Sequence, residues 1–231
     1  MPMRPGPEPM YVARLLYPLR VLGPGKRVGI WFAGCSRGCP GCSNPELWKQ
    51  DPRYLVSGDT VLKMIHAIRE TRGAGSIDGF TLTGGDPFEQ PEALRELLPR
   101  LREISADILA YSGFRLRELW NRGCRDILDQ LAVVIDGPYV ESRNTNCFLR
   151  GSDNQEIHIL NAALEERYRE YLKNGRNEVQ NFRTRDGFIS AGIHRPEYPR
   201  ELREALLAKG VTIGGETCGD LTAPEHTQNQ H

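Results

Sequence analysis

Short apolar runs alternate with amphipathic stretches over the first part of the chain. Four runs are apolar almost throughout and short enough to be buried strands: residues 28–33, 79–83, 107–112 and 131–135. In the stretches between them, apolar residues recur every three or four positions, as on one face of a helix: residues 61–68, 93–101 and 116–120. Strands that alternate with helices in this way predict an α/β fold, with a parallel sheet and right-handed crossovers.

A loop of unusual composition follows each of the four predicted strands. The loops carry a cysteine cluster, a Thr-Gly-Gly-Asp, a Tyr-Ser-Gly-Phe and an Asp-Gly-Pro-Tyr motif: residues 35–42, 83–86, 111–114 and 136–139. The carboxyl ends of parallel strands lie along one edge of a sheet, and α/β proteins bind their ligands there. We therefore expect the four loops to form a single functional site.

The pattern changes after Arg150. A helix-like stripe over residues 160–172 is followed by a turn, a strand at 187–193 and a helix at 201–209 that ends at Gly210. These apolar residues need a surface to cover, so we expect residues 187–193 to pack near the exposed edge of the sheet. The expected parts are a flexible leader, a core, an α+β extension packed on the core, and a disordered polar tail: residues 1–10, 11–156, 157–221 and 222–231.

Composition narrows the class of partner. The chain has 231 residues, and its 30 Lys and Arg balance its 30 Asp and Glu, so no overall field favours nucleic acid or a membrane surface. No run of apolar residues is long enough for a transmembrane helix. Residues 1–10 are rich in proline and lack the apolar centre of a signal peptide, so we expect a cytoplasmic protein.

Cys35, Cys39 and Cys42 are spaced C-x3-C-x2-C. Three thiolates on one tight loop can hold three corners of a 4Fe-4S cluster, and no fourth cysteine lies near, so the fourth iron is left open to another ligand. A zinc site made of three cysteines and a histidine is the alternative. The remaining cysteines are expected to be free thiols: Cys124, Cys147 and Cys218.

This cysteine spacing is the signature of the radical S-adenosylmethionine (SAM) superfamily. The local sequence from Cys39 to Trp48 resembles the activating enzymes of anaerobic (class III) ribonucleotide reductase. The resemblance implies a partial open (β/α) barrel that holds a 4Fe-4S cluster and SAM. It also implies the chemistry: SAM chelates the open iron, and one electron cleaves it to methionine and a 5′-deoxyadenosyl radical.

The resemblance also implies which residues contact SAM. Thr83, Gly84, Gly85 and Asp86 match the superfamily's "GGD/E" motif, which contacts the methionyl amine; a plain turn with Asp86 as a helix cap is the alternative. Ser112 matches a segment whose hydroxyl binds the ribose or the carboxylate of SAM, and the alternative is a strand end with a turn.

Two further motifs match the same activases. Asp136 begins a "D-G-x-F/Y" segment and either orients SAM or the substrate peptide, or caps a turn. Arg150, Ser152 and Asn154 belong to an "R-G-S-x-N-Q" segment that suits contacts to adenosine or to an extended main chain, and a solvated turn is the alternative. Among the histidines, His194 is the one that merits a test, because Gly and Arg lie close to it.

The implied function is activation of a glycyl radical enzyme such as anaerobic ribonucleotide reductase, with flavodoxin or ferredoxin as the electron donor. The adenosyl radical would abstract a hydrogen from a glycine of that partner. A radical SAM enzyme that modifies a small molecule, nucleoside or peptide is one alternative, and a non-catalytic iron–sulfur or zinc protein is another. The resemblance covers residues 28–156 and weakens after 160, which leaves the target open.

Overall fold

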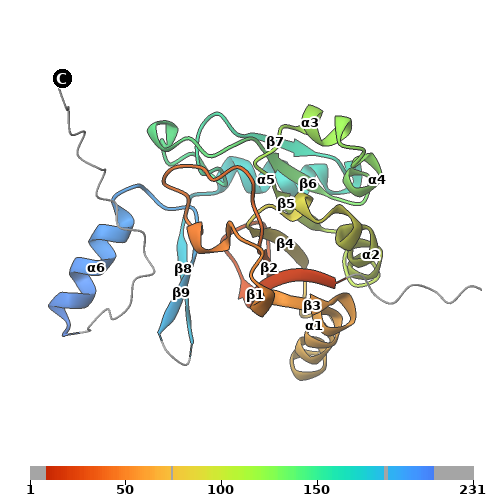
Figure 1. The fold of residues 1–231 in the computed structure, drawn as a ribbon, viewed down its shortest axis with the longest axis horizontal. Helices are drawn as coiled ribbons and strands as arrows, with labels where there is room; N and C mark the ends of the chain where they lie inside the picture. The colour runs from red at the N-terminus through yellow and green to blue at the C-terminus, as the bar shows by residue number, and fades with distance from the viewer. Residues whose placement is uncertain (1–8, 74, 185–186, 211–231) are drawn as a thin grey trace, which may run out of the picture. The chain divides into compact units, whose positions relative to one another are not determined.

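The computed structural model describes residues 9–73, 75–184 and 187–210. The chain divides into two compact units, Met1–Arg195 and Pro196–His231. The first unit is built on a seven-stranded sheet with the order β3-β1-β2-β4-β5-β6-β7 (Figure 1). In chain order its strands are β1 (Pro9–Leu19), β2 (Arg27–Phe32), β3 (Leu55–Ser57), β4 (Gly79–Gly84), β5 (Ile108–Tyr111), β6 (Val133–Asp136) and β7 (Glu156–Ile159).

The four central strands are parallel, and antiparallel strands flank them. β2, β4, β5 and β6 pair in parallel, whereas β1 pairs antiparallel with both β2 and β3, and β7 pairs antiparallel with β6. Every residue of β2 and of β6 is buried, as expected for strands covered on both faces. The predicted α/β fold with a mostly parallel open sheet is confirmed.

Helices follow the central strands in the predicted order. They are α1 (Gly58–Arg72), α2 (Pro91–Arg102), α3 (Leu116–Asn121) and α4 (Arg125–Leu128). Ser57 caps the start of α1, because its side chain accepts a hydrogen bond from the main-chain N–H of Thr60. α2 buries the apolar stripe that its sequence predicts: Ala93, Leu94, Leu97, Leu98 and Leu101.

The two faces of the sheet pack against different helices. Ile108 and Ala110 of β5 belong to the apolar cluster that also contains the buried side chains of α1, α2 and α4. Leu109, the residue between them, faces the other way and packs with Tyr168 of α5 (Glu165–Asn174). α5 comes after the motifs in the sequence, so part of the chain beyond residue 160 completes the core.

Two strands cross boundaries that were expected from the sequence. β1 begins at Pro9, so the last two residues of the expected leader belong to a strand. β7 spans Glu156–Ile159, so the expected boundary between core and extension falls inside a strand of the main sheet. Neither strand shows regular alternation: the pairing of β1 shifts register twice, and β7 has only 4 residues. Residues 1–8 and the expected tail at 222–231 lie outside the described residues.

A β-hairpin of the extension packs on β1 and β2. It consists of β8 (Val179–Arg183) and β9 (Phe188–Gly192), the second of which was predicted from the sequence. Ala191 is buried in an apolar cluster with residues of β1 and β2, including Leu19 and Trp31. Gln180 adds two hydrogen bonds, from its Nε2 to the carbonyl of Pro18 at 2.7 Å and from the N–H of Arg20 to its Oε1 at 2.9 Å. The hairpin therefore lies along the β1 side of the sheet.

The second unit contains α6 (Tyr198–Ala208), which confirms the helix predicted at 201–209. A proline in its first turn starts the helix, and the described residues of this unit end at Gly210. None of the helices in the described part of the chain is both long and apolar enough to cross a membrane.

A buried ion pair links the start of β2 to the residue before β5. Arg27, at the start of β2, lies 3.0 Å from Asp107 Oδ1, and both side chains are almost fully buried. The hydroxyl of Tyr168 on α5 donates to the same oxygen at 2.5 Å. Burial raises the pKa of Tyr168, so its hydroxyl keeps the proton that it donates.

Replacing Tyr168 by Phe is expected to lower the free energy of unfolding by about 1.5–3 kcal/mol, because it removes a hydrogen bond to a buried carboxylate. Urea unfolding of both proteins measures the difference. Tyr54→Phe is a suitable control, because Tyr54 is only partly buried and its contact with the Arg53 guanidinium is made by the ring, which phenylalanine keeps. Equal effects of the two substitutions would contradict the role of Tyr168.

Candidate cofactor site

The three motif cysteines lie on a loop that follows β2 and is held by main-chain hydrogen bonds. The N–H of Gly34 donates to the carbonyl of Leu47 at 2.8 Å, and that of Cys35 donates to Trp48 at 2.9 Å, so the loop is closed at its base. Two glycines between the cysteines have the left-handed backbone that favours glycine: Gly38 (φ 51°) and Gly41 (φ 71°). The loop therefore brings all three partly buried thiols into one short stretch of chain.

The thiols are suited to binding a metal cluster. Burial raises the pKa of Cys35 and of Cys42, so both thiols are protonated when free and would release protons on binding metal. A single zinc ion, with Zn–S bonds of about 2.3 Å, would draw its ligand atoms close together. Within the described residues, the group of potential ligands whose atoms lie within 4.8 Å of one another is elsewhere, at Asp136, Glu156 and His158. The three thiols do not form such a group, so nothing in their arrangement within the described residues favours a single zinc ion.

The two other cysteines in the described part of the chain lie away from this loop. Cys124 is buried in the core cluster beside α4, and Cys147 contacts the hydroxyl of Thr145. Both are free thiols, as predicted. Cys218 lies outside the described residues.

The Gly-Gly pair at the end of β4 packs directly on the base of the cysteine loop. The N–H of Gly85 donates to Phe32 at 2.7 Å, and the N–H of Asp86 donates to Gly34 at 2.8 Å. A Cβ on Gly84 would lie 2.6 Å from the carbonyl oxygen of Phe32, and one on Gly85 would lie 2.5 Å from that of Gly34. The space that the sequence suggested for a ligand is therefore filled, at these two Cβ positions, by the backbone of the cysteine loop.

Asp86 and Ser112 contact each other. The Asp86 carboxylate is buried and accepts hydrogen bonds from the Ser112 hydroxyl at 3.0 Å and from the N–H groups of Gly113 and Phe88 at 2.8 and 3.0 Å. The bond from Phe88 caps the short 3-10 helix Pro87–Glu89, as the turn interpretation expected. Burial raises the pKa of Asp86 to about 6, and these hydrogen bonds oppose the rise. The pair therefore joins the loops after β4 and β5.

Replacing Ser112 by Ala is expected to destabilise the protein more at alkaline than at acid pH. The raised pKa means that Asp86 contributes stability below its unfolded pKa and loses that contribution as the pH rises through about 6. Without the hydroxyl, the charged carboxylate loses one of its donors, at a cost of about 1.5–3 kcal/mol at roughly pH 8 and less at roughly pH 5. Urea unfolding at both pH values measures the cost, and an equal loss at the two would contradict this role of the hydroxyl.

Hydrogen bonds join the two remaining motifs, residues 136–139 and 150–155. Side chains of residues 150–155 bond to the main chain of residues 136–139 and of Val140, which follows them. The bonds run from Gln155 Nε2 to the Gly137 carbonyl at 2.8 Å, from Asn154 Nδ2 to the Pro138 carbonyl at 2.8 Å, and from the Val140 N–H to Ser152 Oγ at 3.1 Å. This segment is therefore an ordered clip and not a solvated turn. Two of its buried polar atoms have no hydrogen-bond partner within the described residues: Arg150 Nε and Asn154 Oδ1.

The four loops are continuous along one edge of the sheet. The N–H of Ser112 donates to Ile135 at 2.9 Å, and that of Gly137 donates to Phe114 at 3.1 Å, which joins the loops after β5 and β6. The loop after β6 also returns to the cysteines, because a Cβ on Gly41 would lie 2.7 Å from the Glu141 side chain. The site residues predicted from the sequence are therefore distributed over loops that contact one another.

Sequence reasoning missed a stack of cations on Phe114. Arg37, inside the cysteine motif, lies 4.2 Å from the ring centroid of Phe114, and Arg122 lies 4.1 Å from it. Arg37 also pairs with Glu118 of α3 at 2.7 Å. These contacts fasten the cysteine loop to the segment after β5. The position of Arg37 between two cysteines is the one signal in the sequence that could have found it.

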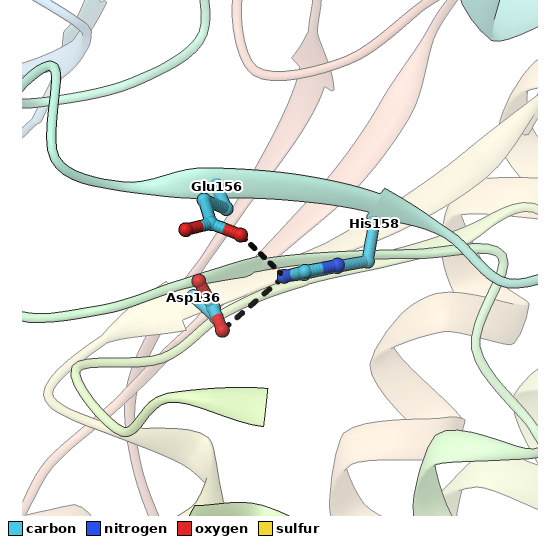
Figure 2. A group of neighbouring side chains, drawn as sticks. All are labelled: Asp136, Glu156 and His158. Carbon is cyan, nitrogen blue, oxygen red and sulfur yellow. Dashed lines mark ion pairs between the residues drawn. The ribbon is translucent and has the colours of Figure 1, made fainter. Parts of the chain in front are cut away.

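Sequence reasoning also missed the partners of Asp136. This carboxylate is 3% exposed, and its Oδ2 accepts a hydrogen bond from the N–H of Leu116 at 2.5 Å. Figure 2 shows His158 between Asp136 and Glu156, with its Nε2 at 3.2 Å from Asp136 Oδ2 and 3.9 Å from Glu156 Oε2. The strand β7 places His158 and Glu156 on the same face as Asp136, since His158 pairs with Val134 and Glu156 with Asp136.

His194, the histidine singled out from the sequence, lies at the end of the hairpin. Its carbonyl accepts a hydrogen bond from Asn144 Nδ2 at 3.2 Å, and Asn144 also donates to the Tyr139 hydroxyl at 3.3 Å. Burial lowers the pKa of His194. The residue therefore connects the extension to the loop after β6 through its main chain.

Comparison with known proteins identifies the family. The model of a family described as a 4Fe-4S single cluster domain matches residues 21–158, which include all four loops. The chain belongs to this radical SAM family. Anaerobic ribonucleoside-triphosphate reductase-activating proteins are among its relatives. The one from Salmonella typhimurium is 31% identical over 151 residues, which are 62% of this chain and 96% of the relative.

Other relatives with the same name agree. The protein from Escherichia coli K12 is 30% identical over 151 residues, which are 62% of this chain and 96% of the relative. That from Enterobacteria phage T4 is 31% identical over 141 residues, which are 59% of this chain and 86% of the relative. The predicted 4Fe-4S cluster and SAM are thus confirmed as cofactors of the family, and the extension after residue 158 lies beyond the family match.

Proposed function

We propose that this radical SAM enzyme generates a glycyl radical on a partner protein, and that the partner is an anaerobic ribonucleotide reductase. The proposal rests chiefly on the relatives, whose names describe activation of that reductase and which align over nearly their whole length. The continuous site made by the four loops supports it, because each motif that resembles the activases lies there.

In this proposal, Cys35, Cys39 and Cys42 hold the cluster. When bound, the cluster supplies the electron that cleaves SAM to methionine and a 5′-deoxyadenosyl radical. The protein positions the cofactor and excludes water from it. The Gly84–Gly85 pair lets the cysteine loop pack closely on the end of β4. The hydrogen bond between Asp86 and Ser112 fixes the loop after β5 against the loop after β4.

The contacts to SAM would come from buried polar atoms that lack a partner in the protein. Arg150 Nε is a donor, whereas Asn154 Oδ1 and Asp136 Oδ1 are acceptors, and none has a hydrogen-bond partner within the described residues. A buried donor or acceptor without a hydrogen bond is destabilising, so a ligand that forms hydrogen bonds to these atoms gains affinity. Hydroxyl, amine and carboxylate groups of SAM offer the matching chemistry. Thr83, which is partly buried at the end of β4, is a further proposed contact to SAM.

The glycine of a partner must reach the cofactor from the open side of the loops, and an extended main chain suits that approach. An electron donor such as flavodoxin or ferredoxin would reduce the cluster. Both interactions are proposed from the relationship to the activases, and the chain's balance of 30 basic and 30 acidic residues sets no overall preference for either partner.

Electron paramagnetic resonance tests the proposed function. The anaerobically reconstituted protein is mixed with SAM, a reductant and the purified anaerobic ribonucleotide reductase of the same organism. A doublet signal of a glycyl radical on the reductase is expected, and it should be absent when either SAM or the reductant is left out. Cleavage of SAM without any glycyl radical would support the alternative, a radical SAM enzyme with a small-molecule or peptide substrate.

A further inference from the structure

The charged group around Asp136 contains four side chains from three parts of the fold. Asp136 ends β6, Glu156 and His158 belong to β7, and Arg115 precedes α3 (Figure 2 shows the first three). Arg115 NH1 lies 3.5 Å from Asp136 Oδ1 and 3.8 Å from Glu156 Oε1. A guanidinium so close to both carboxylates repels a metal cation, so the group is better explained as a network of side chains than as a metal site.

Asp136 needs its neighbours because it is buried. A buried carboxylate without partners is strongly destabilising, and its conformation is set by the groups that compensate its charge. Oδ2 accepts a hydrogen bond from the Leu116 N–H at 2.5 Å and has His158 Nε2 at ion-pair distance, 3.2 Å. Oδ1 lies 3.5 Å from Arg115 NH1, and among the described residues Oδ1, Arg115 NH1 and His158 Nε2 are all without a hydrogen bond. Oδ2 is thus fixed by a main-chain donor and a neighbouring imidazole, and Oδ1, which has only the ion pair with Arg115, can still accept a hydrogen bond from a ligand.

His158 is better placed than Arg115 to hold the carboxylate. It projects from the strand next to β6, on the face that carries Asp136, and its side chain is 26% exposed, against 38% for Arg115. An imidazole with few rotamers on a paired strand loses less freedom than a long arginine on a loop. Glu156 stands 3.9 Å from His158 on the other side, but it is 68% exposed and its field is screened by water.

We propose that His158 is a positioning residue for SAM binding: it holds Oδ2 of Asp136 so that Oδ1 accepts a hydrogen bond from SAM. The inference rests on the proposed function, because it takes SAM as the ligand of Asp136. It assigns a role to a residue outside the four motifs.

The test compares His158→Ala, His158→Gln and Glu156→Gln in the full-length, cluster-reconstituted enzyme. His158→Ala is expected to raise about tenfold both the KM for SAM and the Kd of SAM measured by equilibrium binding to the unreduced enzyme. It should leave kcat within about twofold, because the contact that it supports between Asp136 and SAM is made equally in the ground and transition states. His158→Gln keeps a donor and should recover most of the affinity. Glu156→Gln, at an exposed position, should resemble the wild type. Iron content should be unchanged in all three.

A pH profile separates this role from a merely structural one. Any part of the pH dependence of the KM that belongs to the imidazole should be present in the wild type and missing in His158→Gln. The titration of SAM itself is common to both proteins and cancels in the comparison. Arg115, Asp136 and Glu156 are the charged groups that face the imidazole, and they too are common to both.

Two results would overturn the inference: an unchanged KM in His158→Ala, or identical pH profiles for wild type and His158→Gln. If His158→Ala fails to fold, the profile of His158→Gln decides alone. The test of His158 does not depend on the identity of the protein partner, because it measures the binding and cleavage of SAM. A wild type that cleaves SAM but forms no glycyl radical refutes the proposed function and leaves the role of His158 to be judged by its own data.

Discussion

Replacing any one of Cys35, Cys39 and Cys42 by Ala is expected to reduce bound iron to background and to abolish SAM cleavage. Each thiolate holds a different iron of the cluster, and no other cysteine of the described chain lies on this loop to replace it. Burial raises the pKa of the thiols of Cys35 and Cys42, so cluster binding should release protons and weaken at low pH. Iron analysis and visible absorption of the anaerobically purified variants measure the result.

The control variants are Cys124→Ala, Cys147→Ala and Cys218→Ala. Cys124 is buried in the apolar core and Cys147 contacts Thr145, so neither should affect iron content. The expectation for Cys218 comes from the sequence, because this residue lies outside the described part. If any of these three cysteines proved necessary for iron binding, it could be the fourth ligand of the cluster. That result would contradict the prediction that only three cysteines bind the cluster and that the fourth iron is open. Retention of stoichiometric zinc in place of iron would favour the alternative zinc protein.

Gly85→Ala is expected to lower both iron content and SAM cleavage by more than about tenfold, although the added group is a single methyl. Its Cβ would lie 2.5 Å from the carbonyl oxygen of Gly34 and 3.0 Å from two further backbone atoms, and backbone yields less readily than a side chain. Overpacking of this kind costs about 1–3 kcal/mol and shifts the chain that carries Cys35. Cluster content after reconstitution and 5′-deoxyadenosine formation are the measurements.

Gly58→Ala is the matched control. Its Cβ would meet only the ends of flexible side chains, Glu96 Oε1 at 3.0 Å and Met10 Cε at 3.3 Å, in the first turn of α1. Iron content and activity should therefore stay near those of the wild type. If Gly85→Ala retained its cluster and lost only its affinity for SAM, the glycine would serve ligand space, as the sequence alone suggested, and not the seating of the cysteine loop.

The central strands could be predicted because burial on both faces leaves an unmistakable signal. β2 and β4 read as short apolar runs, and each is followed by a motif. The helices between them showed the period of a half-buried surface, as in α2. The position of the site at the carboxyl edge followed from the parallel order alone.

The edge strands could not be predicted in the same way. β1 is half-buried and irregularly paired, with register shifts that break the alternation of a strand. β7 has only 4 residues, which is too short for any period to show. Their partners are fixed by tertiary contacts, since β7 completes the sheet only once β6 is in place.

The cross-links of the site were also beyond the sequence. Asp86 and Ser112 stand 26 positions apart, and Asp136 and His158 belong to different strands, so no local pattern relates them. The motifs indicated the residue types but not that the glycines face backbone or that Gln155 clips two loops together. The resemblance ended near residue 156, and it gave no reason to expect that Tyr168 completes the core.

Transfer of deuterium from glycine is the most direct measurement of the proposed reaction. The partner reductase is prepared with its glycines deuterated, and the reconstituted enzyme is reduced in the presence of SAM. The 5′-deoxyadenosine formed is then analysed by mass spectrometry. Deuterium in the product together with a glycyl radical on the reductase is the predicted result. Unlabelled 5′-deoxyadenosine, formed at the same rate with and without the reductase, would contradict abstraction from a glycine of this partner.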